Sequence, residues 1–120
     1  MTIVYHELLP ESYLLILVPG GAGGPEAALA NSLHCARRSG KPAVWVDCSL
    51  VNGLSDEATR LLWASHRQLR EHHAELVLVH VPDHLKNELL DHAAGPAPCI
   101  VATLLDAAQH TRALNSPWAA

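Results

Sequence analysis

Polar side chains that could do chemistry gather in one stretch, between an apolar run at residues 43–46 and a helical pattern that starts near residue 56. They are Asp47, Cys48, Ser49, Asn52, Ser55, Asp56 and Glu57. In a parallel sheet covered by helices, the carboxyl ends of the strands and the amino ends of the following helices form one rim, where free N–H groups and the helix dipole favour negative charge. We therefore expect the functional site on this rim.

Catalysis at the rim would need a nucleophile and a base. Cys48 or Ser49 could be the nucleophile, with His80 at the end of the next strand as the base. No nucleophile-elbow glycines surround either residue, and no third group is evident. The simpler expectation is that Asp47 and Ser49 bond backbone groups in the turn after the strand. We predict that the protein is not an enzyme.

A glycine-rich segment, Gly20–Gly24, follows one predicted strand and precedes a helix, which is the position of a phosphate-binding loop. It lacks the Lys-Ser/Thr pair and the glycine spacing of known nucleotide motifs. We expect a strand-to-helix turn opened by Pro25, and we predict no cofactor. A small-molecule sensor or enzyme that holds a nucleotide or another anion between this loop and the Asp47–Ser49 rim is the alternative.

Nine histidines raise the question of a metal site. His72 and His73 are adjacent and so point in different directions on a helix. His80 and His84 lie at a strand end and a helix start, and they would converge only through the loop between them. No His-Glu-x-x-His or Cys-x-x-Cys pair is present, so we predict no metal.

Apolar positions at 3.6-residue spacing predict a helix over residues 56–72. One stripe of it contains Ala58, Leu61, Leu62, Ser65 and Leu69. Arg60, Trp63 and Arg67 fall on the other side, so we expect an exposed indole beside two guanidinium groups. Aromatic and Arg residues grouped on a surface are typical of a protein-binding hot spot. A tryptophan that covers a neighbouring loop or a dimer contact is the alternative.

The start of this helix has an ordinary structural explanation. Ser55 suits an N-cap, and Asp56 and Glu57 in the first turn complement the helix dipole by about 0.3–1 kcal/mol each. This explanation needs no function.

The elements that position these residues can be read from hydrophobic patterns. Strands are expected at 2–6, 13–18, 43–47, 76–81 and 99–102, and helices at 25–38, 56–72, 82–93 and 104–112. This order predicts an α/β class domain with a mainly parallel sheet of about five strands, about four helices and an N-terminal antiparallel hairpin. We expect one domain over residues 1–114 and a disordered tail at 115–120.

Composition limits the partners. The net charge is −4 and the eight basic residues are scattered, so we expect no nucleic acid and no direct membrane insertion. The apolar run 14–18 is too short to span a bilayer. Three cysteines at no scaffold-like spacing fit a reduced compartment, which predicts a cytoplasmic protein.

Two segments carry a resemblance to a known family. They are Asp47-x-Ser49-x-Val51-x-x-Leu54-Ser55-Asp56-Glu57-Ala58 and the later run from Leu69 to Pro82. With the order of elements, they make the chain similar to the STAS domain, the fold shared by anti-sigma factor antagonists and the cytoplasmic ends of sulfate transporters. The family signature is Asp-x-Ser/Thr-x-Val-x-x-Ile-Asp-Ser-Ser/Thr-Gly, and its first half is the better matched here.

The resemblance implies a regulatory role. In the family, a Ser or Thr at the start of this helix is phosphorylated by a partner kinase, which switches binding. Here Ser55 stands at the family's Asp, Asp56 at the phosphoacceptor, Glu57 at the next hydroxyl and Ala58 at the glycine. Asp56 lacks the hydroxyl that a serine/threonine kinase phosphorylates, so we expect it to supply a permanent negative charge; Ser55 as the acceptor is the other reading.

We therefore expect a non-catalytic bacterial signal-transduction module that regulates transcription by binding a protein. The partner would be an anti-sigma factor or serine-kinase-like protein; a transporter ATPase is the alternative, and a homodimer stays open. The predicted contact residues are Asp47, Ser49, Asn52, Ser55, Asp56, Glu57, Arg60, Trp63 and Arg67.

Overall fold

The computed structural model describes residues 2–20, 26–91 and 98–115. Most of the glycine-rich segment, together with Pro25, lies outside these ranges, as do residues 116–120 of the predicted tail at 115–120. Asn115, the first residue of that predicted tail, ends a helix instead. The predictions about an anion-binding loop and, beyond Asn115, a disordered tail are not addressed by the described residues.

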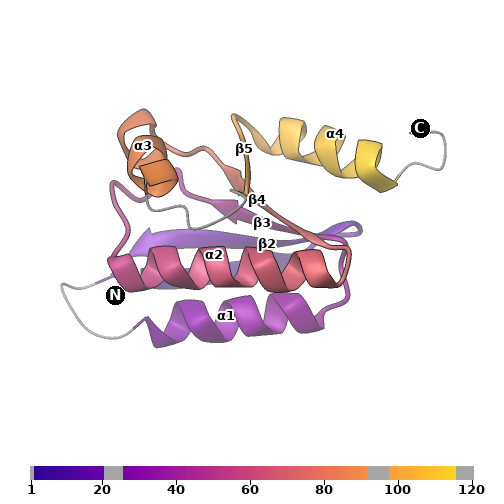
Figure 1. Ribbon diagram of the computed structural model, residues 1–120, viewed down its shortest axis with the longest axis horizontal. Helices are drawn as coiled ribbons and strands as arrows, with labels where there is room; N and C mark the ends of the chain where they lie inside the picture. The colour runs from indigo at the N-terminus through magenta and orange to yellow at the C-terminus, as the bar shows by residue number, and fades with distance from the viewer. Residues whose placement is uncertain (1, 21–25, 92–97, 116–120) are drawn as a thin grey trace.

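Five strands and four helices make up the described chain (Figure 1). They are β1 (Thr2–Leu8), β2 (Ser12–Pro19), α1 (Ala27–Arg38), β3 (Ala43–Asp47), α2 (Asp56–Glu71), β4 (Glu75–Val79), α3 (Asp83–Asp91), β5 (Cys99–Val101) and α4 (Leu104–Asn115). The strands form one sheet in the order β1-β2-β3-β4-β5, antiparallel between β1 and β2 and parallel elsewhere. The predicted α/β class, the mainly parallel sheet and the N-terminal hairpin are confirmed.

The two faces of the sheet differ in how they are covered. Helices α1 and α2 run side by side along one face, and α4 lies on the opposite side (Figure 1). Strand residues alternate between the faces because the side-chain period of a strand is two. Leu15 and Leu17 of β2 join the larger core beneath α1 and α2, whereas Leu14 joins a smaller cluster with Ala107 of α4.

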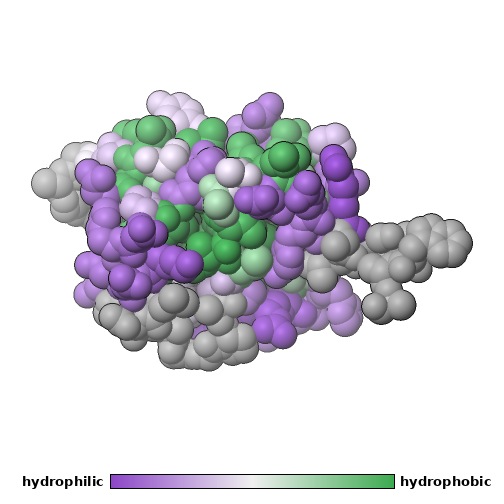
Figure 2. Space-filling model, turned by 90° about the horizontal axis from the view of Figure 1, so that it is seen from above, coloured by the Kyte–Doolittle hydropathy of each residue, from purple (hydrophilic) through white to green (hydrophobic). Residues whose placement is uncertain are grey.

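The smaller cluster is pinned by one buried hydrogen bond. The indole Nε1 of Trp45 donates to Thr111 Oγ1 at 3.1 Å, which fixes α4 against β3. Helix α4 does not cover β1, where Ile3 and Tyr5 are 41% and 61% exposed. Figure 2 looks onto this side and shows apolar atoms gathered between polar ones. No helix among the described residues is long and apolar enough to cross a membrane.

Candidate functional site

The rim begins with a turn that holds the end of β3. The backbone N–H of Ser49 donates to Asp47 Oδ1 at 2.9 Å, which is the local bond predicted for an aspartate after a strand. The Cys48 N–H donates to the Val79 carbonyl at 2.9 Å, so β3 and β4 end side by side. Asp47 therefore has a structural role in this turn, and Ser49 next to it is exposed.

Ser55 caps α2, as the sequence predicted. Its backbone is extended, with φ −65° and ψ 160°, and its hydroxyl oxygen accepts the Ala58 N–H at 3.0 Å. The same hydroxyl donates to Glu26 Oε1 at 3.1 Å. The cap is thus tied to a residue from the start of α1, across 29 positions of sequence.

Glu26 is the central polar residue of this region, and sequence reasoning missed it. Its side chain is only 3% exposed, and Oε2 accepts the Thr2 backbone N–H at 2.9 Å. Burial alone would raise the pKa of the carboxyl, but hydrogen bonds from Thr2 and Ser55 outweigh it and lower the pKa. A buried carboxylate therefore joins β1, α1 and α2.

The two acidic residues of the first turn of α2 have different surroundings. Glu57 Oε2 accepts the backbone N–H of Glu26 at 3.2 Å, which adds Glu57 to the same network. The Asp56 side chain is exposed and has no hydrogen bond or ion pair within the described residues. The network therefore uses Ser55 and Glu57 internally, and it leaves Asp56 as the carboxylate that faces solvent at the positive end of the helix dipole.

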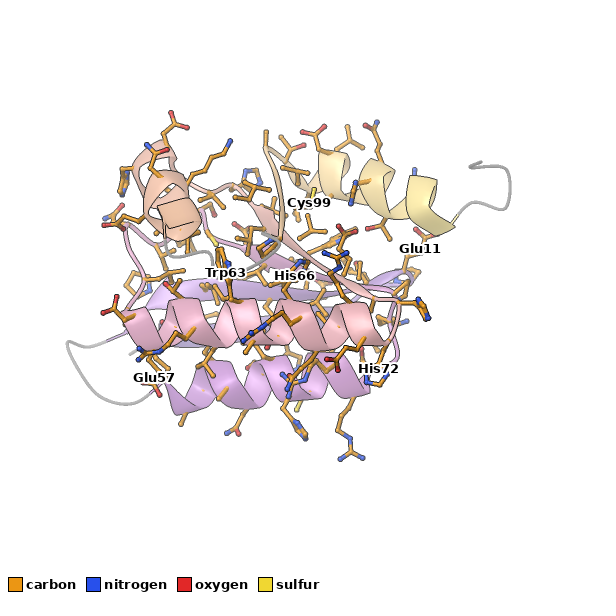
Figure 3. All side chains as sticks on the ribbon, in the orientation of Figure 1. Glu11, Glu57, Trp63, His66, His72 and Cys99 are labelled. Carbon is orange, nitrogen blue, oxygen red and sulfur yellow. The ribbon has the colours of Figure 1, made fainter. Side chains whose placement is uncertain are left out.

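The prediction that Trp63 is exposed was wrong. Its side chain is 6% exposed and belongs to the larger core. The expected stripe was too narrow: α2 also buries Thr59, Trp63 and His66, because it packs against the sheet and α1 while Leu85 of α3 joins the same core. Figure 3 shows Trp63 and His66 on the side of α2 that faces the sheet. Trp63 cannot anchor a partner.

His66 is a second buried residue that the sequence did not single out as functional. It is 3% exposed, and neither ring nitrogen has a hydrogen-bond partner among the residues that the structure describes. Burial, and then the charge of Arg70, lower the pKa of the imidazole and favour its neutral form. His66 follows Leu62 by four residues and precedes Leu69 by three, and this helical spacing could have predicted its burial.

The remaining predicted contact residues reach solvent. Arg60 and Arg67 are exposed on α2, and Arg60 lies one turn after Asp56 on the same side of the helix. Asn52 is exposed, and its carbonyl is hydrogen-bonded to His84 Nε2, which fixes the loop before α2 against the start of α3. We define the rim surface by the exposed members of the predicted set: Ser49, Asn52, Ser55, Asp56, Glu57, Arg60 and Arg67.

Cys48 does not suit the role of a nucleophile. It is fully buried, and its Sγ lies 3.8 Å from the Val46 carbonyl oxygen. Burial, and then the neighbouring charge of Asp47, raise the pKa of the thiol to about 12. Because the thiolate is the reactive form, this cysteine is inert near neutral pH. Ser49 has no hydrogen bond to His80 within the described residues, so no nucleophile–base pair is formed there.

Comparisons with known proteins show the fold. No family model matches the sequence, and no curated protein matches it. Solved structures do match. A serine-to-glutamate variant of RsbS from Moorella thermoacetica has a TM-score of 0.73 at 12% identity, over 91% of this chain and 96% of that one.

Two further structures agree. An anti-sigma factor antagonist (STAS) domain protein from Planctomyces limnophilus has a TM-score of 0.72 at 13% identity, over 92% of this chain and 98% of its own. The anti-sigma factor antagonist SpoIIAA in its unphosphorylated form has a TM-score of 0.70 at 13% identity, over 91% and 97%. The chain therefore has the STAS fold that its sequence pattern predicted.

Proposed function

We propose that the chain is a non-catalytic regulatory module that binds a protein partner through the rim surface. The observation that supports it best is the solvent-facing carboxylate of Asp56 at the amino end of α2, in a chain with the fold of anti-sigma factor antagonists. Such a charge suits an Arg- or Lys-bearing surface on the partner. The exposed Arg60, one turn along α2 from Asp56, would help to orient the bound partner.

The surroundings of Ser55 support Asp56 as a fixed charge and weigh against Ser55 as a phosphoacceptor. The Ser55 hydroxyl lies 3.1 Å from a buried Glu26 carboxylate and also caps the helix. A phosphate on this oxygen would add up to about two negative charges beside that carboxylate, and it would break the cap. A permanent carboxylate at position 56 needs no such rearrangement, although it carries less charge and fewer acceptor oxygens than a phosphate.

The proposed partner is an anti-sigma factor of the serine-kinase type in the cytoplasm of a bacterium. The test is to incubate the wild type and the Asp56→Ser variant with such a cognate kinase and labelled ATP. We expect no label on the wild type and label at position 56 of the variant, since the substitution restores a hydroxyl there. Label at Ser55 of the wild type would contradict the proposal.

A binding comparison distinguishes the kinase from the other partner class. Purified chain is immobilised and presented separately with the kinase-like anti-sigma factor and with the ATPase subunit of a lipid transporter. Retention of the first and not the second supports the proposal, and the reverse result assigns the chain to the transporter. Both arms use Asp56→Asn as the variant and Glu71→Gln as its control, because Glu71 is an exposed acid at the other end of α2.

A further inference from the structure

A second polar cluster lies on the side of the sheet opposite α1 and α2. It consists of Glu75 at the start of β4, Cys99 at the start of β5 and His110 on α4. One ligand atom from each residue lies within 4.8 Å of the other two. Figure 3 shows Cys99 beside α4, well above α2. No other group of three such residues was found in the described part of the chain.

The fold brings these residues together through strand register. Glu75 and Val77 point to the same face of β4, and Val77 is directly paired with Cys99 in β5. The Glu75 and Cys99 side chains are therefore diagonal neighbours on one face. Both strands begin there, so the two side chains occupy the same end of the sheet.

Helix α4 supplies the third side chain. His110 follows Ala107 by one turn, and Ala107 is fully buried in the smaller cluster, so His110 lies on the side of α4 that meets the sheet. The next residue, Thr111, accepts the Trp45 hydrogen bond that fixes the helix. The imidazole is thus held in place by its own element and not by the cluster alone.

The chemistry of the three groups fits a borderline-soft divalent ion. Sulfur, imidazole nitrogen and carboxylate oxygen are the three donor types that Zn²⁺ takes from proteins. The Glu75 and His110 side chains are 22% and 32% exposed, so the site is open to an ion and to a water in a fourth position. Two anionic ligands, thiolate and carboxylate, would balance the charge of the ion.

Without an ion, the cluster is held by one strong contact. His110 Nε2 and Glu75 Oε2 lie 2.8 Å apart, and the Cys99 thiol has no hydrogen bond within the described residues. A cysteine thiol ordinarily carries its proton near neutral pH. A coordinating ion would displace this proton to solvent and would replace the Glu75–His110 contact with two metal–ligand bonds.

We propose that Glu75, Cys99 and His110 form a Zn²⁺ site with one position open to water, which fastens α4 to the first residues of β4 and β5. The proposal does not depend on the partner or on the rim surface. Because the ligands come from three elements, the bound ion would stabilise the folded state against the unfolded chain.

The test uses the full chain, freed of metal with a chelator and titrated with Co²⁺ and Zn²⁺. Co²⁺ is a spectroscopic substitute for Zn²⁺, and a thiolate ligand gives a charge-transfer absorption band that imidazole and carboxylate do not. We expect one ion per chain by native mass spectrometry and a thiolate–Co²⁺ band. At a hundredfold excess of free Zn²⁺ over Kd, Tm should rise by on the order of 10 °C.

Matched variants assign the ligands. Cys99→Ser is expected to abolish the band, and His110→Ala or Glu75→Gln should weaken Zn²⁺ binding at least about tenfold. The controls are Cys35→Ser, an exposed cysteine on α1, and the double variant His72→Ala, His73→Ala. Both controls should bind as the wild type does. Absence of the band in the wild type, or its persistence in a folded Cys99→Ser protein, would overturn the proposal.

Discussion

The polar clusters around Glu26 and around Cys99 differ in how many of their polar atoms have hydrogen-bond partners within the described part of the chain. Around Glu26, each carboxylate oxygen has a donor from the same chain, so the network is closed and acts as a frame between β1, α1 and α2. Around Cys99, one thiol has no partner among the described residues and a carboxylate meets a single imidazole. The closed cluster gives rigidity and leaves the neighbouring Asp56 carboxylate without a partner among the described residues, whereas the open cluster has capacity for an added ion.

The largest expected effect concerns Trp63, which the structure assigns to the rigid interior and not to the rim surface. Trp63→Ala removes a buried ring from the core and should lower the free energy of unfolding by about 3–5 kcal/mol. Urea denaturation measures this change. Arg67→Ala, one turn later and exposed, is the control and should change it by less than about 0.5 kcal/mol. If both variants lowered the free energy of unfolding by a similarly small amount, Trp63 could not be a core residue, and its assignment to the interior would be wrong.

The closed cluster is tested next by Glu26→Ala. The variant leaves the Thr2 N–H and the Ser55 hydroxyl without their acceptor, so we expect a loss of about 2–4 kcal/mol in the free energy of unfolding. Glu71→Gln, which removes an exposed acid, should be nearly neutral. If Glu26→Ala lowered the free energy of unfolding as little as Glu71→Gln does, the Glu26 hydrogen bonds would not stabilise the contact between β1, α1 and α2.

The same carboxylate predicts an acid dependence. The pKa of Glu26 is lower in the folded chain than its ordinary value of 4.5, so the folded state binds fewer protons than the unfolded state. Its contribution to stability is therefore present above about pH 4.5 and is lost as the pH falls through the lowered pKa. The free energy of unfolding, measured by urea denaturation at several values between pH 7 and pH 3, should fall less steeply with decreasing pH for Glu26→Gln than for the wild type. Parallel pH profiles would contradict this assignment.

A smaller effect is expected at the support of the open cluster. Thr111→Val removes the acceptor of the Trp45 indole N–H and should cost about 1–3 kcal/mol, because a buried donor loses its partner. If α4 positions His110 as the structure shows, this variant should also weaken Zn²⁺ binding in a folded protein. Unchanged Zn²⁺ affinity in Thr111→Val would show that the Trp45–Thr111 hydrogen bond is not needed to position His110.

The sequence predicted the fold because alternation and helical spacing are local signals. Element boundaries were less certain: β4 begins and ends earlier than the predicted 76–81, and α4 continues to Asn115 instead of ending near Arg112. Trp63 was misplaced because helical spacing alone does not reveal how many neighbours a helix has, and α2 packs on more than the sheet. The N-cap at Ser55 was predictable because it depends on residues three apart.

The contacts across the sequence were not predictable. Glu26 reaches Ser55 across 29 residues, and Glu75 reaches His110 across 35. Spacing along a chain does not give such pairs, because they depend on how the strands are ordered and on which face each side chain points to. His110 was therefore absent from the histidine pairs that the sequence suggested for a metal.

The most direct test of the central claim is the affinity of the kinase-like anti-sigma factor for the wild type, Asp56→Asn and Glu71→Gln, measured by calorimetry. Asp56→Asn removes the outward charge and leaves the Glu26 network in place. We expect this variant to bind about tenfold or more weakly, which corresponds to about 1.4 kcal/mol, and Glu71→Gln to bind as the wild type does. Equal affinities of the Asp56→Asn variant and the wild type would contradict a partner-binding role for this carboxylate.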